Sequence, residues 1–259
     1  MSNEKIKIKT KKSKEKLHKS NLETTRKLKV ALPKGHLWES TEELLRLGGI
    51  TIDNVERRYR PPTNQKDIQF YIVKPRNIPK MVESGMVDVG IVGVDLVMDE
   101  GADVNLQMDL KTMPVYLVMA STSNYQEQGK RGQEKEKQEN QIKLKVASEY
   151  TGIAKTYFEK KGQEVEIFKT YGSTECFVPE FAQVIVDHVQ TGRGLKQNNL
   201  QVFDMIMKST THLISNKNIG QEKQTILAEF GEKLAKGLAQ MDLSYPGFLT
   251  KEEIINNDF

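Results

Sequence analysis

The chain of 259 residues contains a single cysteine, Cys176, so it cannot form an internal disulfide. Chains that lack disulfides are typical of reducing compartments, and this composition predicts a cytoplasmic protein. No cysteine and histidine residues have the spacing of a zinc site. The composition therefore argues against a disulfide-stapled secreted domain and against a zinc finger.

Long hydrophobic runs are missing as well. Every apolar stretch is interrupted by Asp, Glu or Gly well before the length of about 20 residues that a membrane-spanning helix needs. The first residues also lack the apolar segment of a secretory signal. We therefore expect a globular protein that neither crosses a membrane nor is exported.

An excess of positive charge is missing outside the N-terminal segment. Residues 1–27 hold ten Lys or Arg against three acids, whereas the whole chain has a net charge of only +4. The basic character thus belongs to this segment, which we predict to be a disordered tail. Contact with nucleic acid or an acidic surface is the alternative to a solvated tail, and we predict no nucleic-acid partner.

Short apolar runs alternate with helical patterns along the rest of the chain, which predicts an α/β protein with largely parallel sheets. Residues 124–141 are rich in Gln, Glu and Lys and predict a flexible loop. Residues 203–207 fit a helix or a strand. The expected strands are 29–32, 68–73, 87–93, 116–120, 143–147, 164–168, 184–186 and 212–214, and the expected helices are 37–47, 77–85, 151–161 (capped by Thr151) and 221–240.

Residues 184–200 carry the clearest chemical pattern. A short apolar run, which predicts a buried strand, meets Asp187 and then a Thr-Gly-Arg-Gly turn at 191–194. Glycines let the backbone approach an anion, and successive backbone amides form a nest for it. Thr191 adds a hydroxyl and Arg193 a charge, while Asp187 suits ribose hydroxyls or Mg²⁺. The alternative is a plain strand-to-helix turn with a surface arginine.

Other candidates follow the ends of predicted strands, which face the ligand in many α/β proteins. Lys34 and His36 lie where the first strand leads into its helix. Gly93 ends a glycine-containing strand, and Asp95 begins the next helix. Residues 172–175 (Gly-Ser-Thr-Glu) are expected to open a helix whose N-terminus suits an anion.

Several of these segments, taken in order, resemble short-form ATP phosphoribosyltransferase, the first enzyme of histidine biosynthesis. The resemblance covers about residues 28–240. Its motifs are Leu-Pro-Lys-Gly at 32–35, Val-Lys-Pro-Arg-Asn-Ile-Pro at 73–79, Gly-Met-Val-Asp-Val-Gly-Ile-Val-Gly at 85–93, Val-Ala-Ser-Glu-Tyr at 146–150, Gly-Ser-Thr-Glu at 172–175 and the phosphoribosyl-diphosphate loop within 184–200.

The resemblance implies a two-domain fold of the periplasmic-binding-protein kind, with the active site in the interdomain cleft. Domain I would comprise residues 28–114 plus 206–259, and domain II residues 115–205 with the phosphate loop. It also implies Mg²⁺ as cofactor, ATP and phosphoribosyl diphosphate as substrates, a homo-oligomer, and a regulatory subunit similar to histidyl-tRNA synthetase.

The resemblance assigns roles to individual residues. Asp187, Glu175 and Lys34 would be catalytic, and Asp187 would also hold the metal ion. The turn at 191–194 would bind the 5-phosphate, and Lys34, Lys74 and Glu175 the other phosphates and the ribose. The substrate-binding set is Thr191, Gly192, Arg193, Gly194, Leu195, Lys74, Gly93 and Asp95.

The chain departs from the family pattern at several positions. His36 and Lys74 replace arginines, Asn77 replaces an acid, and Gly194 replaces the second Thr of the phosphate loop; the stretch 176–183 is one residue shorter than usual. Each change removes a charge, a bidentate fork or a hydroxyl. A non-catalytic homologue that binds a nucleotide or a sugar phosphate is therefore the alternative to the enzyme, and a structural subunit is a third.

Overall fold

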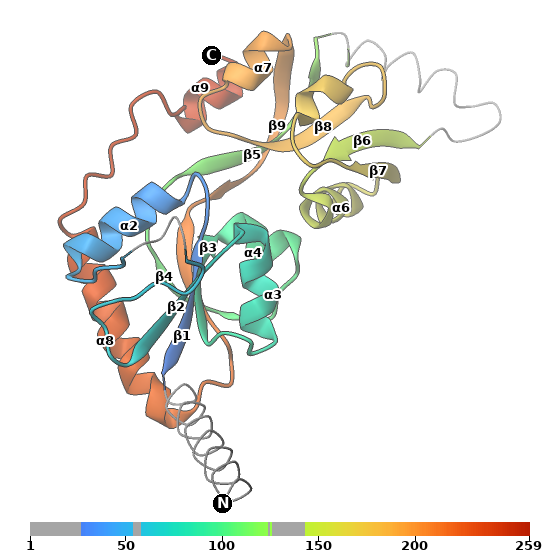
Figure 1. The fold of residues 1–259 in the computed structure, drawn as a ribbon. Helices are drawn as coiled ribbons and strands as arrows, with labels where there is room; N and C mark the ends of the chain where they lie inside the picture. The colour runs from blue at the N-terminus through green and yellow to red at the C-terminus, as the bar shows by residue number, and fades with distance from the viewer. Residues whose placement is uncertain (1–26, 54–57, 124, 126–142) are drawn as a thin grey trace, which may run out of the picture. The chain divides into compact units, whose positions relative to one another are not determined.

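The computed structural model describes residues 27–53, 58–123, 125 and 143–259 (Figure 1). Most of the predicted basic tail and of the predicted loop at 124–141 lies outside the described residues. The chain divides into two compact units. Unit 1 holds residues up to Ile91, Asp103–Met108 and Leu213–Met241, and unit 2 holds Val92–Ala102, Asp109–His212 and Asp242–Phe259.

The first sheet has five strands in the order β2-β1-β3-β10-β4. Strand β1 is parallel to both β2 and β3, as βαβ connections require. All its residues except Lys29 are buried, which explains the continuous apolar run from Val30 to Pro33. The strands are β1 Leu28–Pro33, β2 Ile68–Val73, β3 Val89–Gly93, β4 Asn105–Asp109 and β10 Thr211–Ser215.

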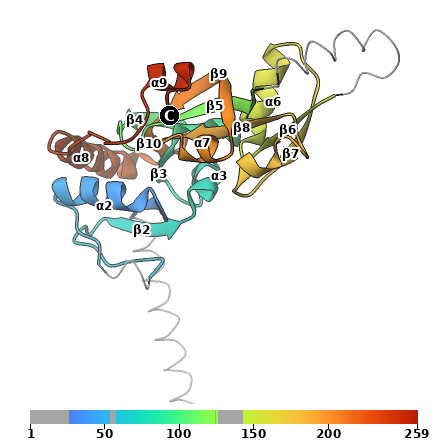
Figure 2. The ribbon, with the colours of Figure 1, turned by 90° about the horizontal axis from the view of Figure 1, so that it is seen from above.

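Helices cover both faces of the part of this sheet that belongs to unit 1. Helices α2 (Trp38–Leu47) and α8 (Gln221–Leu238) lie side by side on one face, and α3 (Ile78–Glu83), preceded by η2 (Pro75–Asn77), lies on the other (Figures 1 and 2). The ring of Phe230 on α8 packs against the ring of Phe70 on β2, with the ring centroids 6.2 Å apart. Burial of these apolar stripes is what stabilises the helices.

The second sheet corrects the expectation of largely parallel pairing. Its order is β7-β6-β8-β5-β9, with β6 parallel to β7 and β8 but β5 antiparallel to both β8 and β9. A buried apolar run predicts a strand but not its direction, so the sequence could not show this. The strands are β5 Val115–Thr122, β6 Leu144–Ser148, β7 Val165–Lys169, β8 Val184–Val189 and β9 Leu200–Ser209.

Short helices complete unit 2, and several differ from prediction. Residues 172–175 do not open an α-helix, because only the 3-10 turn η3 (Thr174–Phe177) forms there. Thr151 is the first residue of its helix rather than its cap. Strand β4 and helix α9 were not predicted. The helices are α4 Val94–Asp99, α6 Thr151–Lys160, α7 Arg193–Gln197 and α9 Lys251–Asn256.

The C-terminal segment belongs to unit 2, whereas the resemblance placed residues 206–259 in domain I. Ile254 of α9 is fully buried in the core of unit 2, which accounts for this placement. Residues 92–102, 109–114 and 206–212 also fall in unit 2. None of the described helices is long and apolar enough to cross a lipid bilayer.

Candidate functional site

Two parallel strands of unit 2 bring acidic residues together. In the pairing of β6 with β8, Ser148 lies opposite Val186, so Glu149 and Asp187 follow at the same edge of the sheet. The Ser148 hydroxyl donates to the Val186 carbonyl (2.5 Å), which ties the two strand ends together. The carboxyl ends of parallel strands are the usual place for a ligand in such folds.

A pocket of about 170 Å³ opens at the end of β8. Most of the site residues predicted from the sequence line this pocket, because the chain turns sharply after β8 and continues into α7. The residues that line it are Glu175, Ile185, Asp187, His188, Val189, Gln190, Thr191, Gly192, Arg193, Gly194 and Leu195.

The turn from β8 into α7 has the backbone conformation of an anion nest. Gly192 is left-handed, with φ of 68°, and α7 begins at the next residue with right-handed angles. Successive amides in such a turn point toward one side, where they can donate to the oxygens of a phosphate. Thr191 and Arg193 are exposed on this turn, and Leu195 is buried beneath it. The predicted phosphate loop therefore has a backbone suited to its role.

Glu175 reaches this loop from η3. Its carboxylate lies in the space that a side chain at position 194 would occupy. Gly194 itself does not have the positive φ at which a side chain would be strained. The missing threonine of the family pattern is thus replaced in space by the Glu175 carboxylate, which brings a negative charge next to the turn.

His188 is bonded to Asp187. The backbone N–H of His188 donates to Asp187 Oδ1 (2.7 Å), and its Nδ1 lies 3.2 Å from the same oxygen. Burial lowers the pKa of His188, but the hydrogen bond and charge of Asp187, together with the charges of Asp95 and Glu149, outweigh it and raise this pKa. The Tyr150 ring packs edge-on against the imidazole.

Gln190 places an unpaired donor in the wall of the pocket. Its Nε2 atom is buried, and it has no hydrogen-bond partner within the described part of the chain. Buried polar atoms that lack a hydrogen-bond partner in the protein are rare. Where they occur, a water molecule, an ion or a ligand ordinarily supplies the partner. An oxygen-rich ligand would satisfy this donor.

Unit 1 presents a second group of candidates at the edge of its own sheet. The last residues of β1 and β2 are aligned, and the N–H of Lys34 donates to the Val73 carbonyl (2.8 Å). Lys34 and Lys74 therefore follow adjacent parallel strands, and both side chains are exposed. The Lys34 ammonium lies 5.4 Å from the centroid of the exposed Tyr59 ring. This edge suits phosphate groups.

Gly93 and Asp95 form a buried arrangement at the start of α4. The Ser209 hydroxyl donates to Asp95 Oδ1 (2.6 Å), and the Asp95 N–H donates back to that hydroxyl (3.1 Å). The Asp95 carboxylate takes the space of a side chain at position 93, so only glycine fits there. Both residues thus have a packing role, in which Asp95 joins α4 to the end of β9.

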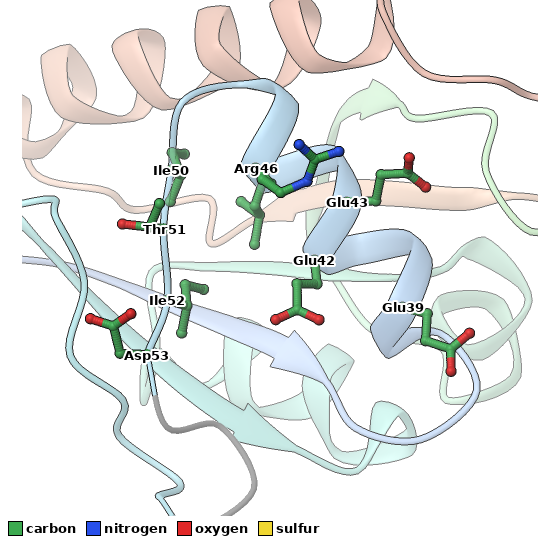
Figure 3. Close-up of a pocket in the computed structure, with 9 residues that line it drawn as sticks. Glu39, Glu42, Glu43, Arg46, Ile50, Thr51, Ile52 and Asp53 are labelled. Atoms are coloured by element: carbon green, nitrogen blue, oxygen red, sulfur yellow. The ribbon is translucent and has the colours of Figure 1, made fainter.

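A larger pocket in unit 1 has the wrong charge for a phosphorylated substrate. It measures about 410 Å³ and lies between α2 and residues 50–53 (Figure 3). Glu39, Glu42, Glu43 and Asp53 line it, against one cation, Arg46. Such a surface repels phosphate, so we assign no substrate to it.

The carboxylates of the pocket at β8 suit a magnesium ion that is shared with a substrate. No cluster of three or more His, Cys, Asp or Glu side chains able to hold a metal occurs among the residues that the structure describes. Mg²⁺ in phosphoryl sites is commonly bound by one or two carboxylates plus substrate phosphates and water. Asp187, whose side chain is only 13% exposed at the pocket, fits that pattern.

Three residues in or beside the pocket were given no role from the sequence, although Glu149 and Tyr150 belong to the motif at 146–150. Glu149, Tyr150 and His188 all lie at the ends of β6 and β8. The signal was available, because an acidic residue comes within two residues of the end of both predicted strands. Without the strand order, however, nothing showed that the two strands are adjacent.

Comparisons with known proteins agree with one another. The family model of ATP phosphoribosyltransferase (HisG) matches residues 74–236. The ATP phosphoribosyltransferase of Halalkalibacterium halodurans is 33% identical over 211 residues, which cover 80% of this chain and 94% of the relative. That of Aquifex aeolicus is 34% identical over 210 residues, which cover 81% and 94%. A chain of the solved ATP phosphoribosyl transferase (HisG:HisZ) complex from Thermotoga maritima superimposes with a TM-score of 0.70 at 26% identity, covering 83% of this chain and 100% of that one.

Proposed function

The chain belongs to the ATP phosphoribosyltransferase family, and on that premise we propose that it condenses ATP with phosphoribosyl diphosphate, the first step of histidine biosynthesis. The N1 atom of adenine attacks the anomeric carbon of the ribose, the bond from that carbon to the diphosphate breaks, and pyrophosphate leaves. Positive charge develops at the sugar carbon, as in glycoside cleavage. The observation that carries the proposal is the nest at the end of β8, with Asp187 beside it.

The residues of unit 2 are proposed to bind the phosphoribosyl diphosphate. Thr191 and the amides of the turn would hold the 5-phosphate, and the unpaired Nε2 of Gln190 offers a further donor. Asp187 and Glu175 would accept from the ribose hydroxyls. Mg²⁺ would neutralise charge on the leaving diphosphate, and we propose that Asp187 would hold it.

The residues of unit 1 are proposed to bind phosphate groups through charge. Lys34 and Lys74 are exposed cations on adjacent loops, so each would be accessible to a phosphate oxygen. We propose that catalysis comes mainly from positioning two anionic substrates and from electrostatics, since no residue stands out as a general base. Gly93 and Asp95 would act through packing and not by direct contact.

The likeness to a chain of the HisG:HisZ complex supports a regulatory partner. We propose that this chain works in the cytoplasm as a homo-oligomer with a subunit of that kind, similar to histidyl-tRNA synthetase. The partner is proposed to change the rate and not the chemistry.

The test mixes the purified protein with ATP, phosphoribosyl diphosphate and Mg²⁺ and follows pyrophosphate release, with and without a HisZ-like partner. We expect release only when both substrates are present. Binding of phosphoribosyl diphosphate without release in either condition would favour the non-catalytic homologue instead.

A further inference from the structure

The C-terminal segment of the chain lies against the back of the phosphate loop. After α8 the chain continues to α9, which packs on β9, as α7 also does (Figure 1). A helix of six residues is too short to be stable alone. Here a capping box holds it, because the Thr250 hydroxyl accepts from the Glu253 N–H (3.2 Å) and the Glu253 carboxylate accepts from the Thr250 N–H (2.7 Å).

Two contacts anchor α9 to the second sheet. Ile254 is fully buried in a cluster that includes Leu195 of α7 and Val202 of β9. The Asn257 side chain pairs with the backbone of Val202, whose N–H donates to Oδ1 (2.5 Å) and whose carbonyl accepts from Nδ2 (3.1 Å). These contacts fix the segment between Leu249 and Phe259, the two residues that meet the loop.

The segment touches the loop at its left-handed residue. The Leu249 N–H donates to the Gln190 carbonyl (2.6 Å). An added Cβ on Gly192 would lie 2.6 Å from Phe259 Cβ and 2.9 Å from Leu249 Cδ1. Leu249 and Phe259 therefore pack closely against Gly192, whose backbone forms part of the anion nest.

We propose that Leu249 and Phe259 are positioning residues for phosphoribosyl diphosphate. A glycine-containing turn samples many conformations, and ordering it during binding costs free energy. By packing on Gly192 before substrate arrives, the two side chains hold the amides of the turn in the binding conformation. The inference rests on the proposed function, because under that function the loop binds a phosphate.

The test compares Phe259→Ala, the conservative Phe259→Leu, and Ile255→Ala, an exposed position on α9 as the matched control. We expect Phe259→Ala to raise KM for phosphoribosyl diphosphate about tenfold with KM for ATP unchanged, Phe259→Leu to restore most of the loss, and the control to match the parent. An equal rise in both KM values, or no rise, would overturn the inference.

Amide hydrogen exchange of residues 191–196 without substrate gives a second readout. We expect faster exchange in Phe259→Ala than in the parent and in Ile255→Ala. Unchanged exchange would overturn the inference whether or not the parent is active. A parent that releases no pyrophosphate would contradict the proposed function, while the exchange result would still decide whether the segment orders the loop.

Discussion

The candidate residues of the two units differ in charge. Unit 1 offers exposed cations, Lys34 and Lys74, on neighbouring loops after β1 and β2. Unit 2 offers a turn of backbone amides flanked by carboxylates, chiefly Asp187 and Glu175. Amides and lysines both bind phosphate, but only carboxylates suit ribose hydroxyls and Mg²⁺. We therefore propose that unit 1 neutralises charge and that unit 2 recognises the sugar phosphate.

The largest effect is expected from Asp187→Asn. We predict a fall in turnover of about 100-fold, in line with loss of a group that stabilises developing charge. Stability should change by less than about 1 kcal/mol, because Asn keeps the oxygen that accepts from the His188 N–H. Steady-state pyrophosphate release and thermal unfolding measure the two quantities. Turnover equal to the parent would exclude a catalytic or metal role for Asp187.

The cations of unit 1 are tested by Lys34→Ala and Lys74→Ala. Each removes a hydrogen bond to a charged group, worth about 1.5–3 kcal/mol, so KM for a phosphate-bearing substrate should rise about tenfold or more. Lys66→Ala is the matched control, since Lys66 lies exposed before β2, at the opposite end of that strand. If all three variants behave alike, the edge after β1 and β2 does not bind phosphate.

Gly194→Thr sharpens the comparison by adding the hydroxyl of the family pattern. The Thr side chain must displace the Glu175 carboxylate, which is the mobile end of a long side chain. We predict that phosphoribosyl diphosphate binds about tenfold tighter, because the new hydroxyl can donate to a phosphate oxygen. ATP affinity should not change. Calorimetry at fixed Mg²⁺ measures both, and weaker binding would show that the Glu175 carboxylate is needed where it lies.

The smallest effect is expected from Asp204→Asn, an acid of unit 2 outside the pocket. Partial burial raises the pKa of Asp204, but hydrogen bonds from Lys161 and Tyr157 (2.6 Å each) outweigh it and lower this pKa. Its stabilising contribution is therefore present above the unfolded-state pKa and lost as pH falls through the folded-state pKa.

For this partly exposed group we expect a loss of at most about 1 kcal/mol at neutral pH, with turnover unchanged. The difference in melting temperature between parent and Asp204→Asn should vanish in acid. A difference that persists there would mean that the ion pair is not its cause. Together with Asp187→Asn, this variant separates a structural acid from a functional one.

Much of the fold was predictable from periodicity. Strands β1 and β2 and helix α2 lie where apolar runs and a leucine-rich pattern place them, and the two-domain α/β class is confirmed. Strand β4 was missed because Asn105–Asp109 is mostly exposed and mixed in polarity. Helix α9 was missed because six residues give too short a pattern, and only its capping box marks it.

The site was predictable in part. The turn at 191–194 follows from its residue types, and the structure brings it together with Asp187 and Glu175. The contacts of Phe259 with Gly192 join residues that are far apart in the chain, so no local pattern shows them. The sequence also could not show that Asp95 is buried and bonded to Ser209, which joins α4 to the end of β9.

The measurement that tests this account most directly is the affinity of Thr191→Val for phosphoribosyl diphosphate. The substitution keeps the shape of an exposed side chain and removes only the hydroxyl proposed to bind the 5-phosphate. Calorimetry at fixed Mg²⁺ should give a dissociation constant about tenfold higher than that of the parent, with ATP binding unchanged. Equal affinity of variant and parent for phosphoribosyl diphosphate would contradict the assignment of this loop.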